Sequence, residues 1–340
     1  MRSPSYKRRA RTLLLPVVGL FLVPSSLYPT TMSGQSSGRV LPPLSEAERI
    51  LRDRLKQHVW ALAGEIGERN FWKPEALEAS ARYIEKNLRE SGYDVASHSF
   101  VVQGQTVRNL EAELAGTVLS DEIVLLGAHY DSIIGSPGAN DNATGTAALL
   151  EIARLLAGKT VGRSIRFVAF VNEEPPFFQT EAMGSRVYAR RARERDEKII
   201  AMLSLETVGY YSDAKGSQAY PFPFNFSSYP STGNFIGFVG NLSARELVRK
   251  SVRSFRQHAS FPSEGVAAPG WLVGIGWSDH WSFWKEGYPA IMVTDTALFR
   301  YNHYHKMTDT PDHIDYTRMA RVAAGIARVA VDLAAPVTGR

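Results

Sequence analysis

Apolar and polar positions follow two different periods along the chain, and these periods predict its elements. Residues 45–62 place apolar side chains at helical spacing, and Ser45 with Glu48 forms the signature of a capping box. A second helix is predicted over residues 74–91. Segments 95–103 and 107–114 alternate partly between apolar and polar residues, as half-buried strands do. The folded body is therefore expected to begin near residue 45.

Short, almost continuously apolar runs replace this pattern after residue 123. Such runs occupy residues 123–130, 164–172 and 199–206, and helical patterns at 143–157 and 185–195 separate them. Apolar strands joined by helical crossovers form parallel sheets that are covered on both faces. This order predicts an α/β fold, specifically a three-layer α/β/α sandwich with a mixed, mostly parallel central sheet. Active sites on such sheets gather at the carboxyl ends of the strands.

The C-terminal third extends the same architecture. Its pattern predicts a strand at 235–240, a helix at 244–258, a helical segment after residue 278, a strand at 290–294 and a final helix at 316–333. Residues 212–235 are rich in Ser, Pro, Gly and aromatic residues, which predicts a long ordered loop able to wall a pocket. No repeat and no second boundary interrupts the body, so we expect one domain over residues 41–340.

The formal net charge of +5 originates at the N-terminus. Residues 1–40 contain six basic residues and no acidic one, and removing these six from the 39 leaves 33 basic against 34 acidic residues. A nearly neutral body excludes a nucleic-acid-binding function. A basic cluster, an apolar run at 12–24 and a Ser/Pro-rich segment predict a signal peptide or an uncleaved membrane anchor, followed by a flexible segment. We therefore expect an exported protein, periplasmic or secreted, with membrane attachment if the leader is retained.

Metal-ligating residue types stand where predicted strands end. The chain contains no cysteine, so a metal ion must be held by His, Asp and Glu. His129 ends the first apolar run, and Asp131 lies two residues later on the same face, where a carboxylate can hold the second ring nitrogen of a metal-bound histidine. A lone histidine here would more often be structural. Asp141 opens a helix, where it serves either as an N-cap or as a carboxylate that bridges two ions.

Further carboxylates and histidines follow the next strands. Glu173 and Glu174 come directly after an apolar run, and adjacent carboxylates repel unless a cation is near or one acts as a base with an altered pKa. Glu206 ends the run at 199–206 in the same way. His303 and His305 precede an acidic, turn-rich stretch and would otherwise be surface residues. Imidazole and carboxylate ligands together suit catalytic Zn²⁺.

With these motifs assembled, residues 45–335 resemble the co-catalytic di-zinc aminopeptidase family, whose relatives include leucyl aminopeptidases, glutamate carboxypeptidases and glutaminyl cyclases. The resemblance rests on the order and spacing of AHYDS (128–132), GANDNATG (138–145), NEE (172–174), SDHWSFW (278–284) and HYHKMTDTPD (303–312). Single-domain exported bacterial zinc aminopeptidases are the most similar members. No single motif would suffice, but the combination is highly specific.

The resemblance implies a role for each candidate residue. It implies that one zinc ion is bound by His129 and Glu206, that a second is bound by Glu174 and His305, and that Asp141 bridges them. Asp131 would support His129, Glu173 would be the general base, and Asp279 with His280 would have supporting roles. Two ions share and activate one water molecule in such sites. Ile275 occupies the position of a tyrosine found in some aminopeptidases, so oxyanion support must come from metal, backbone or another side chain.

The implied activity is hydrolysis of the N-terminal bond of peptides or proteins with a free terminus. Three alternatives remain at this point. A glutaminyl cyclase uses one zinc ion and forms pyroglutamate, and a binding or receptor-like domain would have lost the chemistry. A carboxypeptidase would need a cationic anchor for the substrate carboxylate, for which Arg186 and Arg300 are candidates. An aminopeptidase is favoured because no inserted lid domain interrupts the strand-helix core.

Overall fold

A computed structural model describes residues 30–32, 40–222, 224 and 229–336. The predicted capping box begins helix α1 (Glu46–Val59): the Ser45 hydroxyl accepts a hydrogen bond from the Glu48 amide at 3.2 Å, and the Glu48 carboxylate accepts one from the Ser45 amide at 2.7 Å. A wider π-helical turn, η2 (Trp60–Ile66), continues α1 beyond the predicted end. The predicted leader lies outside the described residues except for Thr30–Met32 and Val40, so export stays a prediction.

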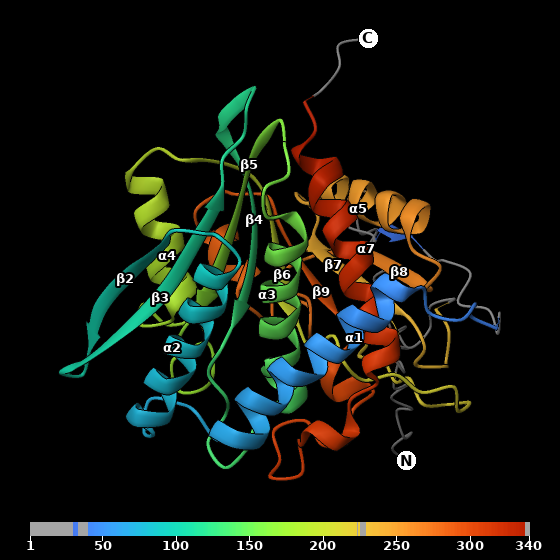
Figure 1. Cartoon of the computed structure of the whole chain (residues 1–340). Coiled ribbons are helices and arrows are strands. Elements are labelled where there is room, and N and C mark those ends of the chain that lie inside the picture. Colours follow the sequence, from blue (N-terminus) through green and yellow to red (C-terminus); the bar gives the residue numbers. More distant parts are fainter. Residues whose placement is uncertain (1–29, 33–39, 223, 225–228, 337–340) are drawn as a thin grey trace, which may run out of the picture.

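A nine-stranded sheet forms the centre of the molecule (Figure 1). Its order is β1-β8-β7-β9-β6-β4-β5-β3-β2. The strands in chain order are β1 (Thr30–Met32), β2 (Val95–Val102), β3 (Gln105–Leu114), β4 (Leu119–His129), β5 (Arg163–Phe170), β6 (Lys198–Glu206), β7 (Ile236–Asn241), β8 (Ser263–Ala268) and β9 (Ala290–Thr294). Strands β5, β4, β6 and β9 are parallel neighbours, and six of the nine strands share one direction. The predicted mixed, mostly parallel sheet is confirmed.

Helices cover both faces of this sheet, which confirms the three-layer sandwich. One layer contains α1, α2 (Pro74–Glu90), α3 (Gly145–Leu156), α5 (Arg245–His258) and α7 (Tyr316–Ala334), and the other contains α4 (Gly184–Glu194) and α6 (His280–Lys285). Strand β4 alternates between the two layers. Val124 and Leu126 pack in the cluster under α3 and α7, whereas Ile123 and Leu125 pack with residues of α4 and α6.

One edge of the sheet was not predicted. Strand β8 has the sequence SEGVAA, whose small and polar residues give little strand signal, and β1 pairs with it in antiparallel register from Thr30↔Ala267 to Met32↔Gly265. Across the described ranges, we find no helix with both the length and the apolar character needed to cross a membrane.

The register of the parallel strands determines where the candidate residues lie. Gly127 of β4 pairs with Ser204 of β6, so His129 and Glu206 both reach the carboxyl edge of the sheet. His129 pairs with Phe170 at the end of β5, and Glu173 therefore follows at the same edge. Parallel neighbours thus deliver their terminal side chains to one place.

We predict that Leu126→Ala lowers the free energy of unfolding by about 2–5 kcal/mol, because it leaves a cavity under a strand buried on both faces. Leu126 is fully buried in β4. Urea unfolding followed by circular dichroism measures the loss. Val118→Ala, at a side chain that is 64% exposed, is the control and should change stability little. Equal losses in both variants would contradict this assignment of the core.

Candidate metal centre

The five predicted ligands meet at the carboxyl edge of the sheet. His129 ends β4, Glu206 ends β6, Glu174 follows β5, Asp141 lies in η3 (Ala139–Thr144), and His305 belongs to the loop after β9. Four of them are buried, and the side chain of His305 is 31% exposed. Residues separated by as many as 176 positions in the sequence are thus brought into one cluster, as the sequence predicted.

Asp141 lies between two imidazole groups and presents one oxygen to each. Its Oδ1 is 3.3 Å from His129 Nε2, and its Oδ2 is 3.0 Å from His305 Nε2. Glu206 Oε2 completes the first half of the cluster at 3.3 Å from His129 Nε2. Glu174 Oε2 completes the second half at 3.3 Å from His305 Nε2. Each half therefore contains one imidazole, one terminal carboxylate and one oxygen of Asp141.

Several of these ligand atoms are buried without a hydrogen-bond partner among the described residues: His129 Nε2, His305 Nε2, Asp141 Oδ2 and Glu174 Oε1. Ligand atoms of His129, Asp141 and Glu174 all lie within 4.8 Å of one another. Buried polar atoms normally have partners, so atoms that converge in this way indicate a place for a cation. Imidazole nitrogen and carboxylate oxygen are the ligands of catalytic zinc sites. The donor set fits a metal centre.

Burial controls the electrostatics of the carboxylates. It raises the pKa of Glu173 well above its usual value and raises the pKa of Glu174 to about 8, in both cases with added repulsion from neighbouring carboxylates. Glu173 Oε2 lies 3.9 Å from His129 Nε2, just outside the ligand cluster. Burial opposes ionisation of Asp141 as well, but its two histidine partners hold the pKa of Asp141 well below the usual range. Asp141 is therefore the carboxylate most strongly held in its charged form.

Asp131 does more than the sequence indicated. Its carboxylate lies 3.6 Å from His129 Nδ1, and the backbone oxygen of Asp131 lies 3.2 Å from the same nitrogen. The carboxylate also accepts hydrogen bonds from the amides of Glu173 and Glu174, both at 3.2 Å. One buried side chain thus positions residues from both β4 and the segment after β5.

Two further supports were not identified from the sequence. Asp309, inside the quoted motif at 303–312, accepts hydrogen bonds from the amides of Asn140 at 2.8 Å and Asp141 at 3.1 Å. Ser278, the first residue of the SDH motif, donates a hydrogen bond to Glu206 Oε2 at 2.8 Å. Asp309 and Ser278 both belong to motifs on which the family resemblance rests, but the sequence alone does not show which ligand each of them supports.

The other two residues of the SDH motif occupy the layer behind the cluster. Asp279 is fully buried, and burial raises its pKa to about 7. His280 begins α6, and its Nε2 lies 2.8 Å from the backbone oxygen of Ile275. Burial lowers the pKa of His280 to about 4, so the neutral ring donates this bond. His280 therefore anchors the preceding loop.

Arg69 is a buried cation whose contribution to the site was not predicted from the sequence. Its side chain is fully buried, and within the described part of the chain it donates hydrogen bonds only to backbone oxygens: those of Tyr130, Leu62, Gly67, Pro137 and Gly138. Tyr130 and Gly138 flank the loop that joins His129 to Asp141. The guanidinium group therefore fixes the path of this loop, and its charge acts on nearby Asp131 and Asp141.

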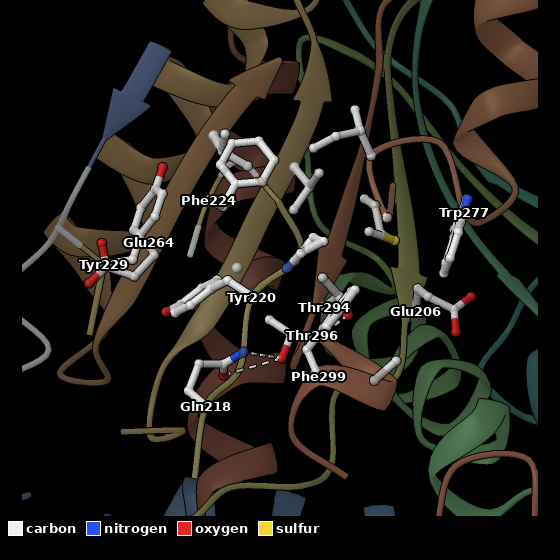
Figure 2. Close-up of a pocket in the computed structure, with 18 of the residues that line it drawn as sticks. Glu206, Gln218, Tyr220, Phe224, Tyr229, Glu264, Trp277, Thr294, Thr296 and Phe299 are labelled. Carbon is white, nitrogen blue, oxygen red and sulfur yellow. Dashed lines mark hydrogen bonds between the residues drawn. The ribbon is translucent and has the colours of Figure 1, made fainter. Parts of the chain in front are cut away.

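A cavity of about 840 Å³, including its open mouth, begins beside Glu206 (Figure 2). The loop contributes to its wall, as predicted, through Gln218, Tyr220, Pro221, Phe224 and Tyr229. The lining is largely apolar and aromatic, with Glu206 at one end of the labelled side chains and Glu264 at the other. No lysine or arginine belongs to the lining that the structure describes.

The two arginines considered as carboxylate anchors lie elsewhere. Arg300 is buried behind the cavity wall, where it donates hydrogen bonds to Gln218 Oε1 and to the backbone oxygen of Phe235, both at 2.8 Å. Arg186 of α4 pairs with Glu286 and with Glu181. Neither guanidinium lines the cavity.

Tyr304 is a further residue of the site that the sequence did not single out. Its ring stacks on His305 with the centroids 3.9 Å apart and the planes at 15°, and it lines the cavity together with Glu206. Burial and the charges of the four site carboxylates raise the pKa of Tyr304 well above its usual value. Its phenol therefore stays protonated and can donate a hydrogen bond.

Comparisons of the sequence with known proteins agree with this site. Residues 109–330 match the model of Peptidase family M28. YfbL, an uncharacterized protein of Escherichia coli K12, is 36% identical over 282 residues, which cover 81% of this chain and 86% of that protein. Leucine aminopeptidase 1 of Arthroderma otae is 25% identical over 336 residues, which cover 92% of this chain and 80% of that protein.

Solved structures share the fold. The zinc aminopeptidase BSAP from Bacillus subtilis superposes with a TM-score of 0.65 at 16% identity and covers 85% of this chain and 96% of its own. The glutaminyl cyclase of Fimbriiglobus ruber superposes with a TM-score of 0.60 at 19% identity and covers 86% of this chain and 96% of its own. At these identities, the likeness concerns the fold alone.

We predict that Asp131→Asn lowers the affinity for zinc by about 10- to 100-fold, because the amide supplies one acceptor oxygen where the carboxylate supplies two. Titration of zinc into metal-free protein against a competing chelator measures the affinity, and thermal unfolding checks the fold. Asp332→Asn is the control, at a side chain that is 42% exposed and pairs with His258. An unchanged zinc affinity in the Asp131 variant would contradict the role given to this carboxylate.

Proposed function

The chain belongs to peptidase family M28, and we propose that it is a zinc aminopeptidase acting on peptides or proteins with a free N-terminus. The observation that carries this proposal is the division of the cluster at Asp141, whose two oxygens face two complete sets of ligands. Two metal ions with one shared carboxylate fit this arrangement. The paired halves also favour a di-zinc peptidase over a single-zinc cyclase, which would leave one half unused.

The assignment of ligands follows the distances. His129 and Glu206 would hold one ion, Glu174 and His305 would hold the other, and Asp141 would serve both. Bound zinc would supply Lewis acidity, which lowers the pKa of water and polarises the scissile carbonyl. The chain's own contribution is to hold these ligands rigidly, through Asp131 on one side and Asp309 on the other.

Glu173 is the proposed general base. Its buried carboxylate has a pKa raised well above the usual value, which suits a group that must both accept and release a proton. It takes a proton from the attacking water and returns it to the nitrogen of the leaving amine. The amide of Glu173 donates to Asp131, so the base is oriented by the same residue that supports His129.

The charges around the cavity favour an amino over a carboxyl terminus. Glu206 and Glu264 belong to the described lining, and Arg186 and Arg300 are engaged elsewhere. A terminal carboxylate would therefore meet no lysine or arginine in the lining that the structure describes, so the lining favours a substrate that enters by its amino end. The apolar walls of the cavity would receive the first side chain of the peptide.

Tyr304 is the proposed donor to the developing oxyanion. Some aminopeptidases have a tyrosine at the position that Ile275 occupies here, and Tyr304 would serve in its place. Its phenol lies in the cavity wall with Glu206, and its ring is fixed against His305. A protonated donor that is already oriented stabilises charge that develops in the transition state.

We predict that Glu173→Gln lowers turnover of aminoacyl nitroanilides by about 10²- to 10⁴-fold, because the amide cannot accept the proton. Zinc content, measured by elemental analysis, should not change. Glu181→Gln, at an exposed side chain of the same loop, is the control and should keep full activity. Loss of zinc from the Glu173 variant would make this residue a ligand instead, and undiminished turnover would remove it from the mechanism.

We predict that Tyr304→Phe lowers kcat by about 10- to 1,000-fold with little change in KM or zinc content, because only the transition state carries the oxyanion. Steady-state kinetics separates the two constants. Tyr210→Phe, at a ring that packs against Tyr301 with centroids 4.8 Å apart and the planes tilted by 45°, should leave both unchanged. A rise in KM alone would assign Tyr304 to ground-state binding.

A further inference from the structure

Three aromatic side chains form an ordered surface beside the metal centre, which we call the aromatic shelf: Phe71, Trp72 and Phe177. Trp72 stacks on Phe177 with the ring centroids 5.8 Å apart and the planes at 20°. Phe71 contacts Phe177 edge-on with the centroids 5.0 Å apart. Phe177 is only 5% exposed, whereas Trp72 is 48% exposed, so the shelf presents one indole to solvent. A large aromatic surface left open in this way is available to a ligand.

The shelf is connected to the metal centre through backbone contacts. The amide of Phe177 donates a hydrogen bond to the backbone oxygen of Glu174 at 3.0 Å. The amide of Trp72 donates a hydrogen bond to Asn70 Oδ1 at 3.2 Å. Trp72 lies three residues after Arg69 in the same segment. The backbone oxygen of Arg69 accepts from the amide of Ser132 at 2.9 Å. The shelf is therefore fixed to the segments that carry both Glu174 and Asp131.

The shelf and the cavity have no described residue in common, although the cavity touches both halves of the cluster: Glu206 of its lining contacts His129, and Tyr304 of its lining stacks on His305. The cavity begins at Glu206, whose Oε2 lies 3.3 Å from His129 Nε2, and its described lining includes no residue from segments 68–73 or 173–183. The shelf follows Glu174, whose Oε2 lies 3.3 Å from His305 Nε2. A peptide that crosses the cluster with its first side chain in the cavity would extend its next residue towards Glu174.

We propose that the aromatic shelf binds the second residue of the substrate and selects an aromatic or large aliphatic side chain there. This inference rests on the aminopeptidase function proposed above. Trp72 offers a flat apolar face whose orientation is already fixed by Phe177, so a second aromatic ring can stack without the cost of ordering the indole. Loss of the indole should weaken binding of such substrates and leave those with a small polar second residue unaffected.

The test compares Leu-Phe-Gly-amide with Leu-Ser-Gly-amide, and release of leucine measures kcat/KM. We expect the wild-type enzyme to prefer the phenylalanine peptide by about 10-fold. Trp72→Ala should abolish that preference by lowering kcat/KM for the phenylalanine peptide while kcat/KM for the serine peptide stays the same. Trp72→Phe should keep part of the preference, which tests the role of the ring if the alanine variant folds poorly. Trp271→Ala is the matched control, since Trp271 is 82% exposed and lies outside the shelf.

The outcomes separate the two proposals. If leucine is released from both peptides at equal kcat/KM, or if Trp72→Ala slows both equally, the shelf does not select the second residue, although the aminopeptidase function stands. If the wild-type enzyme with its zinc releases leucine from neither peptide, the aminopeptidase function itself is wrong.

Discussion

Buried negative charge is the constraint on which this structure depends. Asp141, Glu173, Glu174 and Glu206 are each no more than 6% exposed and lie within one cluster, and burial raises the pKa of three of them. Carboxylates are costly to bury without compensating charge. Two protonated imidazoles would offset at most two of these four charges, and a histidine must give up its proton before it binds a metal. Cations on both sides of Asp141 would offset the repulsion. The close approach of the carboxylates, which is unfavourable without a cation, therefore suits the site to bind metal ions.

In this fold, the ligands and the residues that support them come from different segments of the chain. Ligands come from the ends of adjacent parallel strands, where the register brings β4 and β6 to the same edge. Supports come from the next segments: Asp131 holds the turn after β5, and Asp309 holds the backbone at Asp141. Because the cavity and the aromatic shelf have no described residue in common, the surroundings of the cluster are asymmetric, which an exopeptidase needs to distinguish the two ends of its substrate.

Features encoded in local patterns were predictable from the sequence. The apolar runs that became β4, β5 and β6 predicted the parallel core, and the metal-capable residues at their ends included His129, Glu174 and Glu206. The full set of five ligands, with Asp141 and His305, came from the resemblance of the motifs to the di-zinc family. Strand β8 was missed because its small, polar residues resemble a loop until pairing with β7 defines them. Tyr304 and Arg69 were missed because their roles depend on contacts between distant segments. Their residue types carry no signal of their own.

We propose that Asp141 divides the cluster into two zinc sites. Diffraction from crystals grown with zinc, measured on both sides of the zinc absorption edge, tests it directly because the anomalous signal locates the ions themselves. We expect two anomalous peaks, one between Asp141, His129 and Glu206 and the other between Asp141, Glu174 and His305. A single peak, or peaks away from Asp141 at saturating zinc, would contradict it.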